Sequence, residues 1–497
     1  IFKIFKMGKI NIKFIIISIL VVSLNTACSD DFVVVESSVE NSEDYFNSEN
    51  DYQQALIGAY DLLHSTYLNV MLGEIASDNT LAGGESATDV IGIQEIDDMI
   101  HTPVNQQLRD IWGWMFSGVN RANYILEFKD KTDFPGKEQV LAQARFLRAY
   151  YYFELVKWFG DVPLVIDKRI LFGEQFDLER TPKADVYSQI EVDLKFALEN
   201  LPYVQSEQGR ITKGAAQALL GKAYLYQNKF EEAATVLDDL IINGPYDLVS
   251  DYSTLFEHIG ENNIESVFEV QYSELEGAGF NCLQCSEGNV AVGFSGVRNY
   301  NGPDFSSGFS FNVPVQGMVD EFEADDLRKD VAILDIDAWA IQTGATFSTG
   351  FEHTGYFNRK YIPRTRSSSA QGDQNLTNPN NYRSIRFADV LLMAAEAFNR
   401  GGIDDGKAQI YLNRVRRRAF GDALHDINST GTTLTNDIYH ERRVELVGEG
   451  HRFFDLVRTG KAAQEISGFV VGKHELFPIP AIEIQLTGNI WNQNPGY

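Results

Sequence analysis

The strongest constraint on the fold is an aromatic-rich helical segment that ends at a glycine. Residues 145–165 read Arg-Phe-Leu-Arg-Ala-Tyr-Tyr-Tyr-Phe-Glu-Leu-Val-Lys-Trp-Phe-Gly-Asp-Val-Pro-Leu-Val. Apolar residues recur near the helical period along this segment, so one broad face must be buried against other helices. Gly160 ends the helix, and Pro163, which has no backbone N–H, directs the chain into an extended run. Arg145 and Arg148 lie one turn apart and are expected to meet internal carboxylates, with a functional pair as the alternative.

Helical periodicity returns in many further blocks, which predicts a mostly α fold. The blocks cover residues 51–67, 104–130, 138–159, 182–200, 212–227, 230–243, 383–400 and 404–420.

Two stretches have the alternation of small and large residues that is typical of tetratricopeptide helix pairs. The first runs from Ala216 through Tyr224, turns at Asn228 and continues from Phe230. The second contains Leu391-Leu-Met-Ala-Ala-Glu-Ala, a double-glycine turn and a further helix. Such pairs cannot bury their apolar faces alone, so we expect them to stack into one curved scaffold that is split by an insertion.

The predicted insertion, residues 245–380, differs in texture from the helical blocks. It is rich in Gly, Ser, Asn and Phe and contains short β-like runs at Ser266–Val270 and Gly355–Tyr361. Long irregular segments in compact proteins are usually functional, because loops on a rigid scaffold carry binding residues. We therefore expect a helical scaffold over 49–244, a ligand-binding insertion over 245–380 and a C-terminal helical part of the same unit over 381–497.

The beginning of the chain has the pattern of a lipoprotein signal peptide. Lys9 and Lys13 precede an apolar run that is too short to span a bilayer, and Ala27 stands directly before Cys28. This predicts a signal peptide over residues 1–27 and lipidation at Cys28. The polar, acidic stretch 28–48 is predicted to be a tether between the anchor and the body.

Composition narrows the function further. The net charge of −28 argues against nucleic acid as a partner, because neutralising phosphates requires a basic surface.

With Cys28 lipidated, Cys282 and Cys285 remain as a pair. A local disulfide is the expected state in an oxidising compartment, and a free or metal-bound pair is the alternative.

Four ordered blocks together resemble the SusD/RagB family. Besides residues 145–165, they are Arg383-Ser-Ile-Arg-Phe-Ala-Asp-Val-Leu-Leu-Met-Ala-Ala-Glu-Ala with the following Leu412-Asn-Arg-Val-Arg-Arg-Arg-Ala, then Glu441-Arg-Arg-Val-Glu-Leu-Val-Gly-Glu-Gly-His-Arg-Phe-Phe-Asp, and Phe477-Pro-Ile-Pro with the closing Asn-Pro-Gly-Tyr. The resemblance implies a SusD-like fold and a lipid-anchored outer-membrane protein that faces the cell exterior. It also implies that the protein captures oligo- or polysaccharide without cleaving it. The protein would then act as the lid of a SusC-like TonB-dependent transporter and deliver the glycan to it. A peptide-binding lid of the RagB type and a glycoside hydrolase are the alternatives.

No catalytic or metal-binding motif is complete in this sequence. His440-Glu441 begins like a zinc-protease helix, but Val444 occupies the position of the second histidine ligand. Charged residues of this segment are better explained as ion pairs between helices. We therefore expect no catalytic residue, no metal ligand and no cofactor, although a structural calcium ion is left open.

Candidate ligand residues follow from the chemistry of sugar binding, which needs flat aromatic faces and planar polar groups. In the insertion the candidates are Trp339, Tyr300, Arg298, Phe294 and Tyr272, with Phe280, Asn301, Phe305 and Phe309 as further candidates. The family also contributes ligand contacts from the loop after its first long helices. The residues at that place here are Asp78, Asn79 and Tyr67, with His64 nearby. The competing interpretation is that the phenylalanines hold the loops in place and that Asp78 caps a helix. The remaining tryptophans, Trp112, Trp114, Trp158 and Trp491, are expected in the core.

Overall fold

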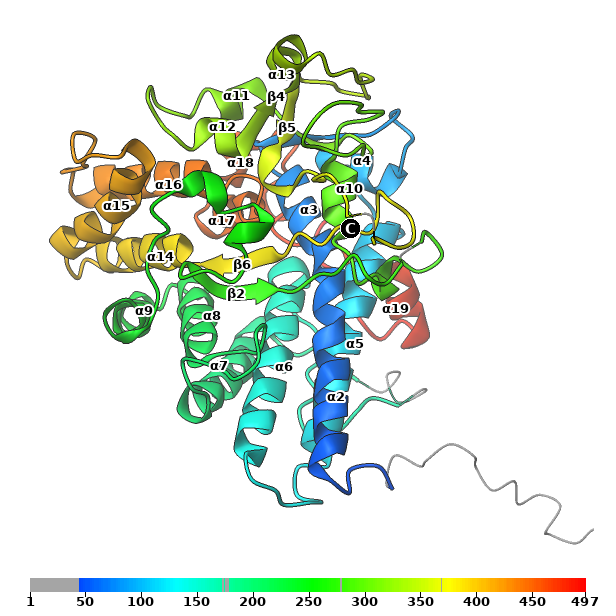
Figure 1. The fold of residues 1–497 in the computed structure, drawn as a ribbon. Helices are drawn as coiled ribbons and strands as arrows, with labels where there is room; N and C mark the ends of the chain where they lie inside the picture. Colours follow the sequence, from blue (N-terminus) through cyan, green and yellow to red (C-terminus); the bar gives the residue numbers. More distant parts are fainter. Residues whose placement is uncertain (1–43, 172–173, 175–177, 278, 368) are drawn as a thin grey trace, which may run out of the picture.

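The computed structural model describes residues 44–171, 174, 178–277, 279–367 and 369–497. The predicted signal peptide, Cys28 and most of the predicted tether lie outside these residues. A short two-stranded sheet crosses the middle of the molecule, with long helices on one side and the irregular insertion on the other (Figure 1).

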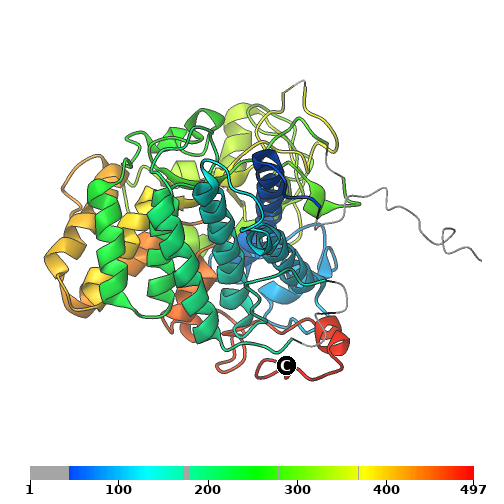
Figure 2. The same cartoon turned by 90° about the horizontal axis from the view of Figure 1, so that it is seen from below.

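The first half of the chain is a series of helices packed side by side. They are α2 (Glu49–Asp61), α3 (Tyr67–Ile75), α4 (Ile91–Asp97), α5 (Gln106–Glu127), α6 (Lys137–Phe159), α7 (Lys183–Asn200), α8 (Lys213–Tyr226) and α9 (Phe230–Asn243). From α5 to α9 each helix packs on the next in sequence, as the view from below shows (Figure 2). The aromatic helix α6 is buried along almost its whole length, and Gly160 ends it with a positive φ of 71°.

The two predicted helix pairs are confirmed, and they stack on each other. α8 packs on α9, α14 (Phe387–Arg400) packs on α15 (Asp405–Phe420), and α14 also packs directly on α9. The scaffold therefore continues across the insertion. The helix predicted over residues 383–400 was wrong at its start, because residues 382–386 form a strand, β6, before α14 begins. All five residues of that strand are buried, and the apolar pattern therefore did not distinguish it from a helix.

Two short antiparallel strand pairs join the insertion to the helical parts, and a third pair lies within the insertion. β2 (Ser266–Val270) pairs with β6 (Tyr382–Arg386), β1 (Thr80–Gly83) with β3 (Phe311–Pro314), and β4 (Ile333–Asp335) with β5 (Tyr356–Asn358). Its helices are α10 (Val290–Ser295), α11 (Gln316–Val319), α12 (Lys329–Ala332) and α13 (Ile336–Thr343). Both β-like runs of the sequence contain a strand. β1 and β2 thus connect the insertion to both helical parts.

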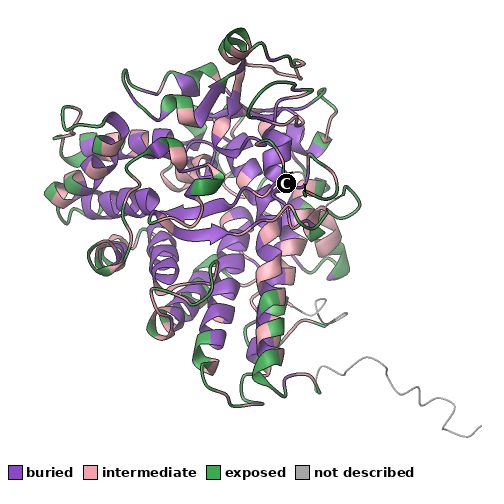
Figure 3. Cartoon of the chain, in the orientation of Figure 1, coloured by how far each residue is buried: buried purple, intermediate pink, exposed green. Residues whose placement is uncertain are grey.

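The chain closes with α16 (Gly431–Glu445), α17 (Arg452–Arg458), α18 (Ala462–Glu465) and α19 (Ala481–Leu486). Buried residues run continuously through the helix stack and the central strands, and exposed residues gather at helix ends and loops (Figure 3). The expected ion pairs of α6 are present, because Arg148 Nη2 lies 2.7 Å from Asp193 Oδ1 and Arg145 Nη1 lies 3.6 Å from the same atom. A functional pair of arginines is therefore not needed to explain them.

Candidate functional site

Four phenylalanines of the insertion form a ladder that leads from the core to the surface. Phe311 and Phe294 have ring centroids 5.3 Å apart, Phe294 and Phe309 5.6 Å, and Phe309 and Phe280 5.9 Å. Phe311 and Phe294 are buried, Phe309 is half-buried and Phe280 is 60% exposed. Among the residues that the structure describes, Phe280 is the only phenylalanine or tryptophan whose ring is largely exposed to solvent. The ladder therefore supports one accessible aromatic ring on a rigid base.

Charged side chains lie beside the outer end of this ladder. The Arg298 guanidinium donates from Nη2 to the Phe309 carbonyl at 2.8 Å. The same group lies 3.5 Å from Asp89 and 3.6 Å from Glu85. Together, Phe280, Phe309, Arg298, Glu85 and Asp89 are called here the Phe280–Arg298 surface. It combines an aromatic ring with the planar donor and acceptor groups that bind hydroxyls.

Local backbone geometry brings the two halves of this surface together. The β1–β3 pair places residues 80–83 against residues 311–314, and the Gly84 N–H donates to the Ser310 carbonyl at 2.8 Å. Gly84 has a φ of +94°, and a Cβ atom there would lie 2.8 Å from the Phe311 ring. Only glycine fits this position without displacing the ladder. The loop with Glu85 and Asp89 is therefore held against the base of the aromatic ladder.

Trp339 lies in a second aromatic cluster with Tyr300 and Phe305. Its Nε1 donates to the Tyr300 hydroxyl at 2.8 Å, and the Phe305 ring lies 5.4 Å away. The Arg359 guanidinium lies 5.7 Å from the Trp339 ring centroid. The indole is half-buried, and its polar edge is already satisfied. Tyr300 is buried and bonded to the Pro303 carbonyl, which gives it a packing role.

Three of the predicted ligand residues have buried side chains. Tyr67, Tyr272 and Phe294 are at most 8% exposed. Burial raises the pKa of both tyrosines above the ordinary value, and the Tyr272 hydroxyl donates to the His64 carbonyl at 2.9 Å. In this structure these three side chains present almost nothing to a ligand, and Phe294 belongs to the aromatic ladder.

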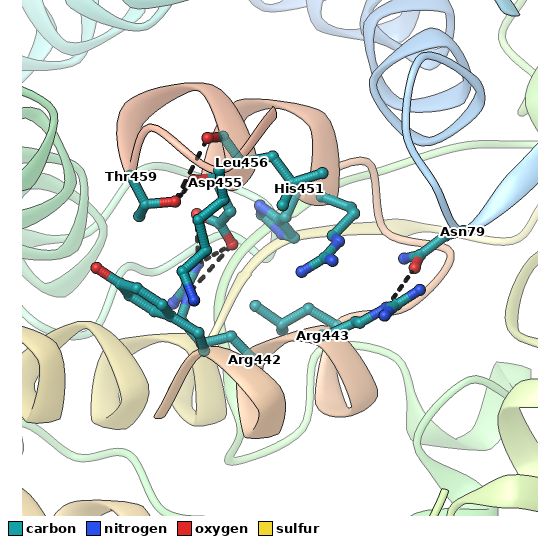
Figure 4. Close-up of a pocket in the computed structure, with 11 residues that line it drawn as sticks. Asn79, Arg442, Arg443, His451, Asp455, Leu456 and Thr459 are labelled. Atoms are coloured by element: carbon teal, nitrogen blue, oxygen red, sulfur yellow. Dashed lines mark hydrogen bonds and ion pairs between the residues drawn. The ribbon is translucent and has the colours of Figure 1, made fainter. Parts of the chain in front are cut away.

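Asp78 and Asn79, which were also predicted as ligand residues, belong to an internal polar network. Arg452 Nε donates to Asp78 Oδ1 at 2.7 Å, and Arg443 Nη2 lies 2.9 Å from the other carboxylate oxygen. Arg443 Nε donates to Asn79 Oδ1 at 2.9 Å, while the Asn79 amide donates to Glu74. The arginines line a small pocket beside α17, with room of about 20 Å³ (Figure 4). Neither the ligand role nor the helix-cap role of Asp78 is needed to explain these contacts.

The structure also places the paired cysteines and the remaining tryptophans. Cys282 and Cys285 form a disulfide in the loop that follows Phe280. Trp112, Trp158 and Trp491 are buried, whereas Trp114 is only half-buried. Trp112 and Trp491 also line an apolar pocket of about 290 Å³ at α5.

Two carboxyl groups with raised pKa values lie at neighbouring amides of β1. Asp97 Oδ2 accepts a hydrogen bond from the Ala82 N–H at 2.7 Å, and Glu352 Oε2 accepts one from the Gly83 N–H at 3.3 Å. Burial raises the pKa of Asp97 to about 7 and also raises the pKa of Glu352. A raised pKa is one requirement of a glycosidase acid, so this pair is where the hydrolase alternative is to be tested.

Sequence reasoning found one half of the Phe280–Arg298 surface and missed the other. Arg298, Phe280 and Phe309 were candidates, because they are aromatic or planar side chains in the insertion. Glu85 and Asp89 carried no local signal, since they lie in a polar turn far away in the sequence. Only the β1–β3 pairing brings them to Arg298.

Comparison with known proteins gives consistent results along the chain. A family described as "SusD family" matches residues 337–475, and one described as "Starch-binding associating with outer membrane" matches residues 31–225. SusD-like protein P2 of Formosa agariphila is 28% identical over 490 residues, which cover 92% of this chain and 94% of the relative. Among the described residues, none of the helices has the length and hydropathy needed to cross a membrane.

Solved structures extend the likeness to the whole fold. A laminarin-binding SusD-like protein is 36% identical, with a TM-score of 0.83, over 91% of this chain and 100% of that chain. Surface glycan-binding protein A from Bacteroides thetaiotaomicron, solved in complex with laminarihexaose, is 26% identical, with a TM-score of 0.80, over 90% of this chain and 99% of that chain. With a mostly α scaffold, a loop-rich insertion and this likeness over nearly its whole length, the chain belongs to the SusD family.

Proposed function

We propose that this chain is a non-catalytic glycan-binding protein of the cell surface, and that its ligand is a β-glucan of the laminarin type. The observation that carries the proposal is the 36% identity, over 91% of the chain, to a laminarin-binding SusD-like protein. The likeness to a protein solved with laminarihexaose supports the same ligand class.

The Phe280–Arg298 surface has the chemistry that the proposal needs. The exposed ring of Phe280 can cover the C–H face of a glucose unit, because such faces are apolar. Arg298 offers donors and Glu85 and Asp89 offer acceptors for the hydroxyls at the rim of that unit. Because the ring rests on Phe309 and the loop carries a disulfide, little order has to be gained on binding.

The anchor and the partner are part of the same proposal. Lipidation at Cys28, followed by an acidic tether, would hold the described body outside the outer membrane. The family resemblance supports a SusC-like TonB-dependent transporter as the partner that receives the glycan. A pull-down of the transporter with the lipidated chain from detergent-solubilised outer membranes tests this part separately.

The ligand is tested by calorimetry with the purified protein. Laminarin is the expected ligand, and starch, a peptide mixture and buffer alone are the other titrants. Removing the exposed ring with Phe280→Ala should weaken laminarin binding about tenfold, which corresponds to about 1.4 kcal/mol. The matched control is Leu275→Ala, which removes an exposed apolar side chain of the same loop without removing a ring. This control should stay within about twofold of the unchanged protein.

Each other outcome has a defined meaning. Binding of starch but not laminarin would reassign the glycan, and binding of peptides alone would favour the RagB-type alternative. Laminarin binding that Phe280→Ala leaves unchanged would move the ligand site away from this surface. Release of reducing ends during incubation, abolished by Asp97→Asn, would replace the binding protein with a hydrolase.

A further inference from the structure

A mixed histidine and carboxylate cluster lies where the insertion meets the scaffold. Asp61 is the last residue of α2, His64 follows in the next turn, and Glu287 comes two residues after the disulfide loop. One side-chain oxygen or nitrogen from each of the three residues lies within 4.8 Å of the other two. The cluster thus brings together three potential metal ligands from two distant segments of the chain.

Hydrogen bonding fixes which nitrogen of His64 faces this cluster. Nε2 lies 2.8 Å from the backbone oxygen of Gln271. A carbonyl oxygen only accepts hydrogen bonds, so Nε2 must carry the proton. In the neutral ring Nδ1 then holds a lone pair. That atom is buried without a hydrogen-bond partner and lies 3.3 Å from Glu287 Oε2. A lone pair and a carboxylate oxygen that face each other at this distance require a proton or a cation between them.

The surroundings hold the histidine in the orientation of a metal ligand. Histidines that bind metals commonly donate their other N–H to a backbone carbonyl, as His64 does to Gln271. The Tyr272 hydroxyl donates to the His64 carbonyl, and the two rings have centroids 5.2 Å apart. Arg121 also pairs with Asp61 and occupies one side of that carboxylate. One oxygen of the same carboxylate lies within the shared 4.8 Å of the cluster.

We propose that Asp61, His64 and Glu287 bind a divalent cation of the zinc class, with His64 Nδ1 and one oxygen of each carboxylate as ligands. One imidazole with two carboxylates suits zinc better than calcium or magnesium, which prefer oxygen ligands alone. All three residues are partly exposed, so water can complete the coordination. The cation fastens the loop that contains Phe280 and the disulfide to the end of α2. This role is independent of which glycan the protein binds.

The test measures zinc binding to the purified protein after removal of metals with a chelator. Calorimetric titration with zinc should show one site, and titrations with calcium and magnesium should be weaker by at least tenfold. Glu287→Gln and His64→Gln should each weaken zinc binding by about tenfold or more, since each removes one ligand. His64→Gln keeps an N–H donor for the Gln271 carbonyl. The matched control is Glu276→Gln, a carboxylate of the same loop outside the cluster, which should weaken zinc binding much less than Glu287→Gln does.

A spectroscopic measurement on the unchanged protein does not depend on how the variants fold. X-ray absorption at the zinc edge should show one nitrogen from imidazole together with oxygen ligands. The proposal is overturned if zinc does not bind, if Glu287→Gln binds it as tightly as Glu276→Gln, or if calcium binds more tightly than zinc.

Discussion

The interior of this protein is built in two different ways on the two sides of the central strands. Around α6 the largest fully buried side chains are aromatic, such as Trp158, Tyr151 and Phe146, and the buried ion pair of Arg148 with Asp193 lies among them. Where the insertion meets the C-terminal helices, the fully buried side chains include Arg328 and Arg386. Apolar contacts are non-directional and tolerate exchange of similar shapes, whereas buried ion pairs depend on the geometry of every partner. We therefore expect substitutions in the scaffold to cost little stability and substitutions in the junction to cost much more.

Arg386 is the centre of the buried ionic junction. Its guanidinium donates to Glu265, Glu445 and Glu449 at 2.6 to 2.9 Å. Burial alone would raise the pKa of Glu445, but the surrounding arginines and Lys360 hold it well below its ordinary value. These contacts tie β6 to α16 and, through Lys360, to the insertion. The junction thus adds a network of buried charges to the apolar contacts that hold the insertion on the scaffold.

Removing the centre of this network should have the largest effect on stability. Arg386→Ala leaves three buried carboxylates without their shared partner, at an expected cost of about 3–5 kcal/mol in the free energy of unfolding. Denaturant unfolding followed by fluorescence measures it. The matched control is Arg414→Ala, whose ion pair with Asp247 is partly exposed and should contribute under about 1 kcal/mol. Equal losses in the two variants would contradict the importance of burial.

Acidification below pH 6.5 should lower the free energy of unfolding. Burial lowers the pKa of His101 and of His451 to about 3, from an ordinary value of 6.5. Between these values the unfolded chain binds more protons than the folded chain, so the free energy of unfolding falls as the pH falls. The slope is at most about 1.4 kcal/mol per pH unit for each histidine.

The free energy of unfolding, measured by denaturant unfolding across this pH range, distinguishes histidines from carboxylates. His101→Asn should show a shallower loss between pH 6.5 and 4 than the unchanged protein, because one depressed histidine is gone. Asp97 acts in the opposite direction, since its pKa is raised to about 7 and its contribution is lost as the pH rises through that value. Asp97→Asn should therefore gain stability relative to the unchanged protein at pH 8 more than at pH 5. A pH profile that neither variant alters would contradict both assignments.

Conservative exchanges compare the two interiors at a finer scale. Leu147→Met in α6 keeps volume and apolar character and should cost less than about 1.5 kcal/mol. Arg386→Lys keeps the charge, but one ammonium group cannot replace the planar guanidinium that contacts three carboxylates. We expect a loss of about 1–3 kcal/mol from the carboxylates left without a partner. A larger loss for Leu147→Met would reverse the comparison of the two regions.

The smallest expected effect concerns Trp339 and the ligand. Its indole packs on Phe305 and bonds to Tyr300, so Trp339→Ala should weaken laminarin binding less than Phe280→Ala does. Affinity electrophoresis in laminarin gels compares the two variants side by side. A stronger loss for Trp339→Ala would return this tryptophan to the ligand site and shift the binding face towards α13.

Helix positions were predictable, because amphipathic periodicity is local. The boundaries of α6, α8, α9 and α15 agree with the sequence pattern within one or two residues. The strand β6 was not recognised, since a fully buried strand and a buried helix show the same apolar run. The candidate site was predicted in part for a similar reason. Residue types indicated which side chains of the insertion suit sugar, but only burial separates exposed Phe280 from buried Tyr272.

The sequence by itself determined the helical scaffold, the paired cysteines, the absence of a complete catalytic motif and the resemblance to the family. These properties depend on residue types at short, fixed spacings. The tertiary structure alone decided that Arg298 meets Glu85 and Asp89, and that Asp61 and His64 meet Glu287. Such contacts join segments that are far apart in the chain, and no local pattern encodes them. The strand pairs and the buried ionic junction bring these segments together, because backbone hydrogen bonds and buried charges leave few alternative arrangements.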